Sequence, residues 1–398
     1  MSVSRVNPNV TRLAVAQALA GANSTVVYAT GAIIGHMLAP KASLATLPVS
    51  VFVIGMALAT LPMGYIGRRF GRRIAFLTGN TCGVIVGLLA AYALKLQSFT
   101  LFCIAMLFGG AYAAVVLTFR FAAAECVDAA QKPRALSTVL AGGVAAGVLG
   151  PQLVSSTMDM SAHTYTVTYL ASAALAVVSG IILMGVKFSN RKPSAQPSIH
   201  RPIGAVVMQP KFLIAMLCGV VSYMTMNFMM TTAPLAMDLC GIERVHSNFG
   251  IEMHVVAMYA PSFFTGRLIS RFGAPIIIQC GLVLTGLAAV VGMTGMSISH
   301  FWLALVLLGV GWNFGFLGAS ALVLTCHTPE DGPRIQSIND FVVFGSMVVG
   351  SFISGGLLAA YGWTTVSGLL FPPVVIAIVG LLWLQRQQRQ MSAVQISS

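Results

Sequence analysis

Charged residues are scarce in this chain, and acidic ones are the scarcest. Asp, Glu, Lys and Arg make up 8% of its 398 residues, only nine residues are acidic, and 57% are hydrophobic. Soluble domains contain about 25% charged residues. The composition therefore excludes an ordinary soluble protein and predicts one that lies in a lipid bilayer.

Motifs typical of enzymes and metalloproteins are also missing. The sequence has no phosphate-binding loop, so direct ATP hydrolysis is not expected. Its seven cysteines form no Cys-x-x-Cys pair, which argues against a zinc site or a thioredoxin-like redox motif. Most of these thiols are expected to be small buried apolar groups. The sequence predicts neither an enzyme nor a bound cofactor.

Long apolar segments are abundant. A helix needs about 20 apolar residues to cross the ~30 Å hydrocarbon layer of a membrane. Segments of this kind are predicted at 12–36, 45–66, 74–96, 99–123, 135–157, 164–186, 212–238, 247–268, 275–298, 300–325, 337–360 and 364–385. The predicted fold class is an all-α membrane protein with 12 transmembrane helices.

The net charge of +13 would suit nucleic-acid binding, but the placement of the basic residues argues against it. Lys and Arg gather in alternate loops, and such loops mark the cytoplasmic side. They are Arg5, Arg12, Arg68, Arg69, Arg72, Arg73, Lys132, Arg134, Lys187, Arg191, Lys192, Arg201, Lys211, Arg267, Arg271, Arg334, Arg386 and Arg389. We expect membrane lipid as a partner, no nucleic acid, and both termini in the cytoplasm.

An internal repeat predicts two halves. The segment Gly64–Gly71 is echoed 202 positions later by Gly266–Gly273. A second echo, 200 positions apart, pairs Cys126, Pro133, Arg134 and Ser137 with Cys326, Pro333, Arg334 and Ser337. Parallel six-helix repeats of this kind are typical of secondary transporters. The predicted domains are a six-helix bundle at 1–186, a cytoplasmic linker at 187–211 and a second six-helix bundle at 212–398.

The loop after the second predicted helix resembles the loop 2/3 signature of the major facilitator superfamily. Its paired glycines and basic cluster are Gly64, Gly71, Arg68, Arg69, Arg72 and Arg73. Gly67 stands where the family usually carries an Asp, which puts in doubt the usual charge lock between this loop and neighbouring helices. The resemblance implies two pseudo-symmetric six-helix bundles, with the loop residues serving topology and gating rather than contact with the solute.

Two neighbouring predicted helices each carry two soft potential metal ligands four residues apart. They are Met226 with Met230, and His254 with Met258. Residues at this spacing share one helix face, and thioether with imidazole favours copper, above all Cu(I). At about 1.5 Å per residue, Met230 should lie at the depth of His254 and Met226 at the depth of Met258. Ordinary packing is the alternative, because Met is a common apolar filler.

These two motifs resemble those of the CcoA-like copper importers, a bacterial group of the same superfamily. The resemblance implies a protein of the bacterial inner membrane that imports copper and supports assembly of a cbb3-type cytochrome oxidase. Copper would be the cargo, and a copper chaperone on the cytoplasmic or periplasmic side would be a partner. The resemblance also makes Cys218 and Cys240 candidates for copper handling at exit and entry.

Two other functions remain open. One is transport of an organic solute, such as a riboflavin-like vitamin or a drug, for which Asn227, Trp312, Asn313 and Phe314 offer aromatic and amide groups. The other is a membrane sensor that binds copper without moving it. A facilitator fold alone does not decide between them.

Proton coupling usually needs a buried carboxylate, and the apolar segments contain few. Glu252 and Asp340 are the main candidates. Arg120 and Glu125, five residues apart, are a further candidate as a charged pair with a structural or gating role.

Overall fold

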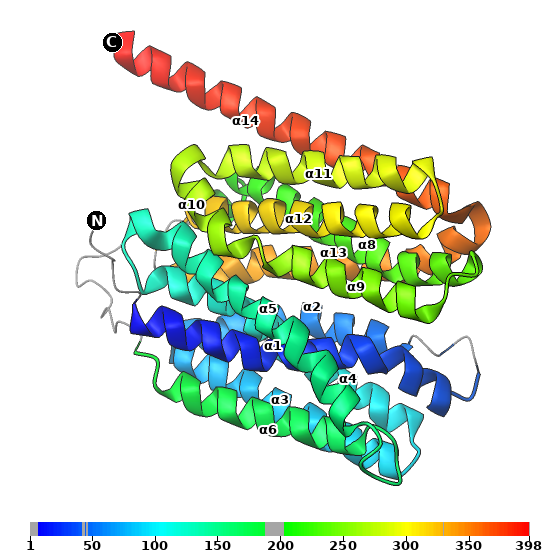
Figure 1. The fold of residues 1–398 in the computed structure, drawn as a ribbon. Helices are drawn as coiled ribbons and strands as arrows, with labels where there is room; N and C mark the ends of the chain where they lie inside the picture. The colour runs from blue at the N-terminus through cyan, green and yellow to red at the C-terminus, as the bar shows by residue number, and fades with distance from the viewer. Residues whose placement is uncertain (1–6, 42–43, 45–46, 188–202, 329, 398) are drawn as a thin grey trace. The chain divides into compact units, whose positions relative to one another are not determined.

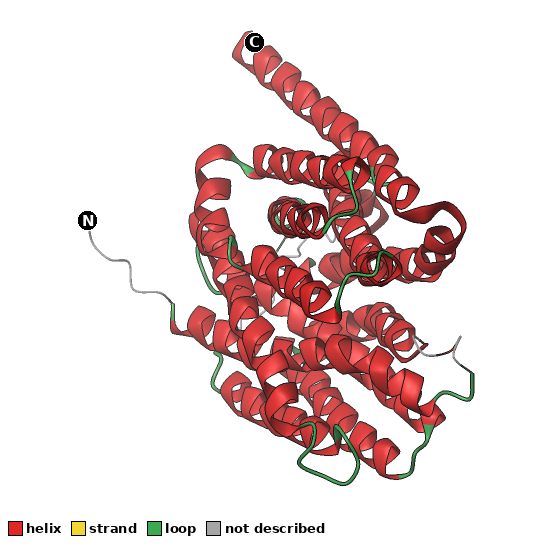
Figure 2. Cartoon of the chain, turned by 45° about the vertical axis from the view of Figure 1, so that its right-hand side comes forward, coloured by secondary structure: helices red, strands yellow, loops and turns green. Residues whose placement is uncertain are grey.

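The computed structural model describes residues 7–41, 44, 47–187, 203–328 and 330–397, and these residues are almost entirely helical (Figures 1 and 2). Arg5 and the predicted linker residues 188–202 lie outside the described part of the chain. The helices are α1 (Pro8–Leu38), α2 (Leu47–Phe70), α3 (Arg72–Lys95), α4 (Phe99–Glu125), α5 (Lys132–Thr157), α6 (Thr166–Met184), α7 (Ile203–Val207), α8 (Pro210–Leu239), α9 (Arg244–Tyr259), α10 (Ser262–Phe272), α11 (Ala274–Thr294), α12 (Ile298–Val323), α13 (Gly332–Gly368) and α14 (Phe371–Ser397), with a short 3₁₀ turn, η2 (Ala129–Gln131).

Ten helices within the described residues are long and apolar enough to cross a membrane. The two other predicted spans, 247–268 and 337–360, lie in helices with different bounds. The span at 247–268 is divided into α9 and α10, where Pro261 has no backbone N–H to donate to the preceding turn. The span at 337–360 lies in α13, which continues past a kink at Gly362, a residue with φ 74°.

The described residues form two compact units. Unit 1 contains α1 to α6 together with 336–348, and unit 2 contains the rest of the second half of the chain. Unit 1 therefore includes a segment of α13 that is distant in sequence from its other helices.

The core of unit 1 depends on close approach of helices at small residues. Helices α2 and α4 lie against each other where Gly55 faces the backbone of Leu107 and Gly110 faces the backbone of Phe52. A side chain at either glycine would collide with that backbone, as is usual where membrane helices pack through small residues. Tyr112 on α4 belongs to the buried cluster between α1, α3, α4, α5 and α6.

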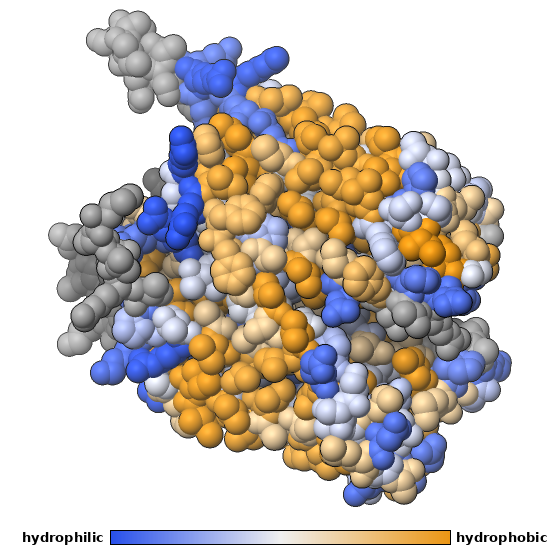
Figure 3. Space-filling model, viewed as in Figure 1, coloured by the Kyte–Doolittle hydropathy of each residue, from blue (hydrophilic) through white to orange (hydrophobic). Residues whose placement is uncertain are grey.

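In unit 2, α12 contacts α8, α9 and α11, so it carries much of the core. Hydrophobic side chains cover most of the visible face of both units, and hydrophilic ones gather toward the helix ends (Figure 3). Large apolar residues that are more than half exposed include Leu58, Ile181, Phe263 and Val379. Such a surface is suited to lipid rather than water.

Candidate functional site

His254 is the most informative of the predicted ligands. Its side chain on α9 is completely buried, and its Nδ1 lies 2.7 Å from the backbone carbonyl of Leu305 on α12. A carbonyl only accepts hydrogen bonds, so Nδ1 carries the proton and Nε2 has a free lone pair. Nε2 has no hydrogen-bond partner among the described residues. A buried imidazole nitrogen without a partner is unusual and points to a ligand.

The three methionines of the predicted sites lie on the same two helices, which contact each other. Met226 on α8 and Met258 on α9 are buried. Met230 is half-buried and packs against an apolar cluster that contains Met229 and Leu308. Packing therefore accounts for Met230, and the arrangement of these residues as two successive copper sites stays a prediction.

The two cysteines differ sharply in environment. Cys218 is buried within the apolar core of unit 2, whereas Cys240 is exposed just beyond the end of α8. The Cys240 Sγ lies 3.9 Å from the Sδ of Met296, which follows α11. Within the described residues no three His, Cys, Asp or Glu side chains come together as a metal site. The roles of Cys218 and Cys240 in copper handling also stay predictions.

An aromatic cluster surrounds Trp312 on α12. The rings of Tyr223 on α8 and Tyr259 on α9 meet Trp312 edge-on at centroid distances of 5.5 and 5.6 Å. Phe316 stacks on Trp312 at 5.1 Å. The buried Trp312 Nε1 has no hydrogen-bond partner in the described part of the chain. Of the four, only Trp312 was predicted from the sequence as a candidate. The i, i+4 spacing of Trp312 and Phe316 is a sequence signal for a shared helix face.

Asn313, the neighbour of Trp312, has a different role. Its amide nitrogen donates to the carbonyl of Met258 at 2.7 Å and to the Ser262 hydroxyl at 2.6 Å. Its amide oxygen accepts from the hydroxyl of Thr265 at 2.7 Å. The amide is thus occupied in joining α12 to the break between α9 and α10, and is not free to bind a solute.

The charged pair predicted between Arg120 and Glu125 is wrong. Arg120 Nη2 donates instead to Asp340 Oδ1 at 2.8 Å, and both side chains are buried. Glu125 lies at the end of α4 and pairs with Arg72 at 2.5 Å. Five residues on a helix place two side chains on different faces, which explains why Arg120 and Glu125 point to different partners.

The turn between α2 and α3 contains a position whose backbone conformation only glycine adopts without strain. Gly71 has φ 90° and ψ 157°, and its repeat equivalent Gly273 has φ 86° and ψ 152°. Gly64 lies in the last turns of α2, and Arg68, Arg69 and Arg73 are exposed. Arg69 donates to the hydroxyl of Tyr65 at 2.7 Å.

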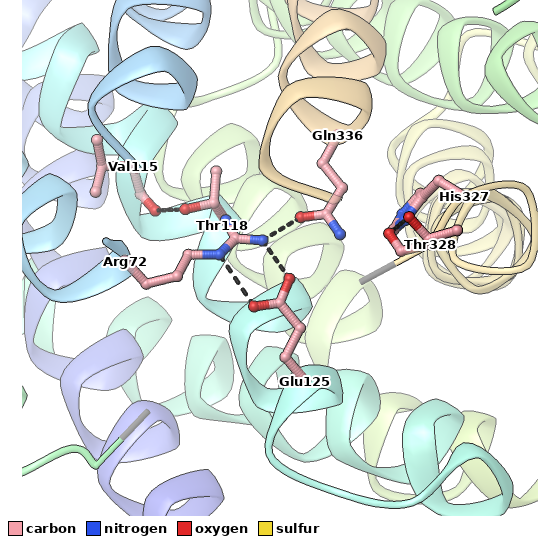
Figure 4. A network of polar contacts seen from close by, with 7 residues as sticks. All are labelled: Arg72, Val115, Thr118, Glu125, His327, Thr328 and Gln336. Carbon is pink, nitrogen blue, oxygen red and sulfur yellow. Dashed lines mark hydrogen bonds and ion pairs between the residues drawn. The ribbon is translucent and has the colours of Figure 1, made fainter. Parts of the chain in front are cut away.

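Among the arginines of this loop, Arg72 forms a network of side-chain hydrogen bonds in unit 1. Its guanidinium donates to both carboxylate oxygens of Glu125 and to the side-chain oxygen of Gln336 (Figure 4). Gln336 belongs to the α13 segment of unit 1 and was not identified from the sequence. A gating role for Gly64, Gly71 and the four arginines stays a prediction.

Cys126, just after α4, is close to this network. Burial and then the charge of Glu125 raise the pKa of its thiol to about 11. The thiol is therefore protonated near neutral pH and a poor nucleophile or metal ligand.

Comparison with known proteins extends these observations. The model of the Major Facilitator Superfamily matches residues 13–261 and 253–395. The riboflavin transporter RfnT of Brucella anthropi is 41% identical over 381 residues, which cover 94% of this chain and 95% of that protein. The uncharacterized MFS-type transporter YddS of Bacillus subtilis is 30% identical, with 90% and 88% of the two chains covered.

Among solved structures, the human organic anion transporter MFSD10 has the same fold. Its TM-score is 0.77 at 14% identity, and the match covers 94% of this chain and 99% of that one. The predicted fold class is thereby confirmed: a multi-pass, all-α membrane protein of the major facilitator type. Transporters of this kind typically need no cofactor. The chain belongs to the Major Facilitator Superfamily and is a membrane transporter rather than an enzyme.

Proposed function

We propose that this protein transports a riboflavin-like organic solute across the inner membrane of a bacterium, with both termini in the cytoplasm. The observation that carries the proposal is the 41% identity with a riboflavin transporter over nearly the full length of both chains. This reading was the alternative in the sequence analysis. The similarity favours it over copper import, for which the comparisons give support only at the level of the superfamily.

The chemistry of unit 2 supports a planar solute. Riboflavin has a flat heteroaromatic ring whose edge carries carbonyl oxygens and an imide N–H. The rings around Trp312 offer stacking and edge contacts of the kind that aromatic groups prefer. Tyr259 is the one residue of the four that is partly exposed, so the solute would approach the cluster from the Tyr259 side.

Two unpartnered polar atoms lie along the contact of α9 with α12. One is the donor Trp312 Nε1 and the other is the acceptor His254 Nε2. His254 bonds to the carbonyl of Leu305, and the backbone of α12 rises by about 10 Å from Leu305 to Trp312. A donor and an acceptor on different turns are suited to a solute that carries hydrogen-bonding groups both on its ring and on an attached chain.

Copper import is the second candidate, and one observation favours it. The buried Nε2 of His254 has the free lone pair that a metal ligand requires, and Met258 follows one turn later on α9. Copper would then be the cargo, delivered to or from a chaperone, and Met226, Met230, Cys218 and Cys240 would line its path.

A growth experiment separates the candidates. The chain is expressed in a bacterium that cannot make riboflavin, and growth is followed at limiting riboflavin. We expect growth with the intact protein and not with the empty vector. In a parallel strain that lacks its copper importer, the same protein should not restore copper uptake. Restored copper uptake without riboflavin-dependent growth would reverse the order of the two candidates.

A further inference from the structure

The most costly feature of unit 1 is a fully buried ion pair in membrane-spanning helices. Arg120 on α4 is 1% exposed, Asp340 on α13 is 0% exposed, and they meet at 2.8 Å. Ionisable groups inside a membrane are expensive and are retained for function. Burial also costs an ion pair much of its Coulombic gain, so stability alone is a weak reason to keep one.

Two acceptor oxygens at the pair lack a hydrogen-bond donor among the described residues. Asp340 Oδ1 accepts from Arg120 and from the amide of Asn339, at 2.8 and 3.0 Å. The second oxygen of Asp340 and the side-chain oxygen of Asn339 are buried and have no partner among the described residues. An ionised carboxylate only accepts hydrogen bonds, whereas a protonated one also donates. Both of these oxygens therefore have room for a hydrogen-bond donor.

We infer that Asp340 is the proton-binding site that couples transport to a proton gradient. A proton from the acidic side forms an O–H bond at the unpartnered oxygen of Asp340, and the same bond breaks when the proton leaves on the other side. Arg120 stays charged throughout. While Asp340 is ionised, Arg120 neutralises it, and while Asp340 is protonated, the salt bridge is weakened and the two helices are freer to separate.

The other acidic residues are less suited to this role. Asp340 is the one fully buried carboxylate among the described residues. Glu252, the second candidate from the sequence, is exposed on α9, and Glu125 is engaged by Arg72. The charged groups that act on Asp340 are Arg120 from α4 and, more weakly, Arg72 from α3.

The first test needs no solute and so does not rest on the proposed function. Infrared spectra of the purified protein are recorded across a range of pH, and the carbonyl band of a buried carboxylic acid is followed. We expect such a band to titrate in the intact protein, to shift when aspartate is isotopically labelled in its carboxyl group, and to be absent from Asp340→Asn. The control Glu252→Gln should keep it.

A lack of any titrating buried-acid band in the intact protein, or a band that persists in Asp340→Asn, would overturn the inference. The isotope label assigns the band to aspartate even if Asp340→Asn does not fold. A second variant with Arg120→Gln added to Asp340→Asn removes both charges and avoids leaving the arginine unpaired. It should also lack the band.

The second test rests on the proposed function and uses riboflavin as the probe. Proteoliposomes are given a proton gradient, and accumulation on the alkaline side is measured. A gradient of one pH unit supports about tenfold accumulation if one proton moves with each solute. We expect this with the intact protein and Glu252→Gln, and its loss with Asp340→Asn. Riboflavin exchange without any response to the gradient would contradict proton coupling, whereas no exchange at all would contradict the proposed function and leave the infrared result to decide the inference.

Discussion

A buried polar atom without a hydrogen-bond partner is better evidence for a functional role than the type of side chain alone. The sequence identified His254, Trp312 and Asp340, and each has a buried polar atom without a partner in the described structure. It also suggested Asn313 as a solute ligand, but hydrogen bonds occupy that amide. Partners far apart in sequence, such as Arg120 and Asp340, cannot be found from spacing along one helix, since nothing local links them.

The indole N–H of Trp312 gives a prediction at this scale. Trp312→Phe keeps an aromatic ring in the cluster but removes the unpartnered donor. We expect the KM for riboflavin to rise roughly tenfold, because a lost hydrogen bond to a buried partner costs on the order of 1.5 kcal/mol. Uptake kinetics measure this. Trp363→Phe, which removes a similar N–H beside Phe301, is the control and should leave KM unchanged.

Apolar length predicted most of the helices, because the membrane thickness sets that length. The breaks were harder to predict, since a proline or glycine is tolerated at many points of a membrane helix. The α9–α10 break at Pro261 is held by the side chain of Asn313 on α12, a contact that the sequence did not reveal. The repeat, in contrast, correctly indicated equivalent turns, since Gly71 and Gly273 have nearly the same dihedral angles.

Removing the Asn313 amide tests its role in joining α9, α10 and α12. Asn313→Leu should lower the free energy of unfolding by about 2 kcal/mol, because three buried hydrogen bonds between helices are lost. Thermal unfolding in detergent is the measurement. Ser270→Ala is the matched control, since that hydroxyl bonds only within α10. Equal melting temperatures for the two variants would show that Asn313 does not join these helices.

The glycines in the turns after α2 and α10 give a second prediction, which concerns the backbone conformation of these turns. Gly71→Ala and Gly273→Ala should each cost about 1–3 kcal/mol, because a side chain is strained at their dihedral angles. Gly286→Ala is the control: this glycine is helical with open space around it, and alanine there should be neutral or slightly stabilising. The melting temperatures of the three variants measure this loss of stability. Similar values for all three would be evidence against a conformational requirement for glycine.

For the whole molecule, composition predicted a membrane protein, and the repeat and the resemblance of the loop after the second helix indicated the superfamily. The solute could not be predicted in the same way, because one fold serves many functions. Met and His at helical spacing favoured copper in the sequence. Packing accounts for Met230, and a relative that is 41% identical to this chain is named for riboflavin. The strongest structural feature behind the copper hypothesis is the unpartnered Nε2 of His254, which would serve an organic solute equally well as a hydrogen-bond acceptor.

Counterflow with the purified protein in proteoliposomes tests riboflavin transport directly. Vesicles loaded with unlabelled riboflavin are diluted into a trace of labelled riboflavin, and a parallel set is tested for uptake of radioactive Cu(I). We predict rapid entry of labelled riboflavin and no copper uptake above that of empty vesicles. Copper uptake that depends on His254, with no riboflavin exchange, would contradict the account.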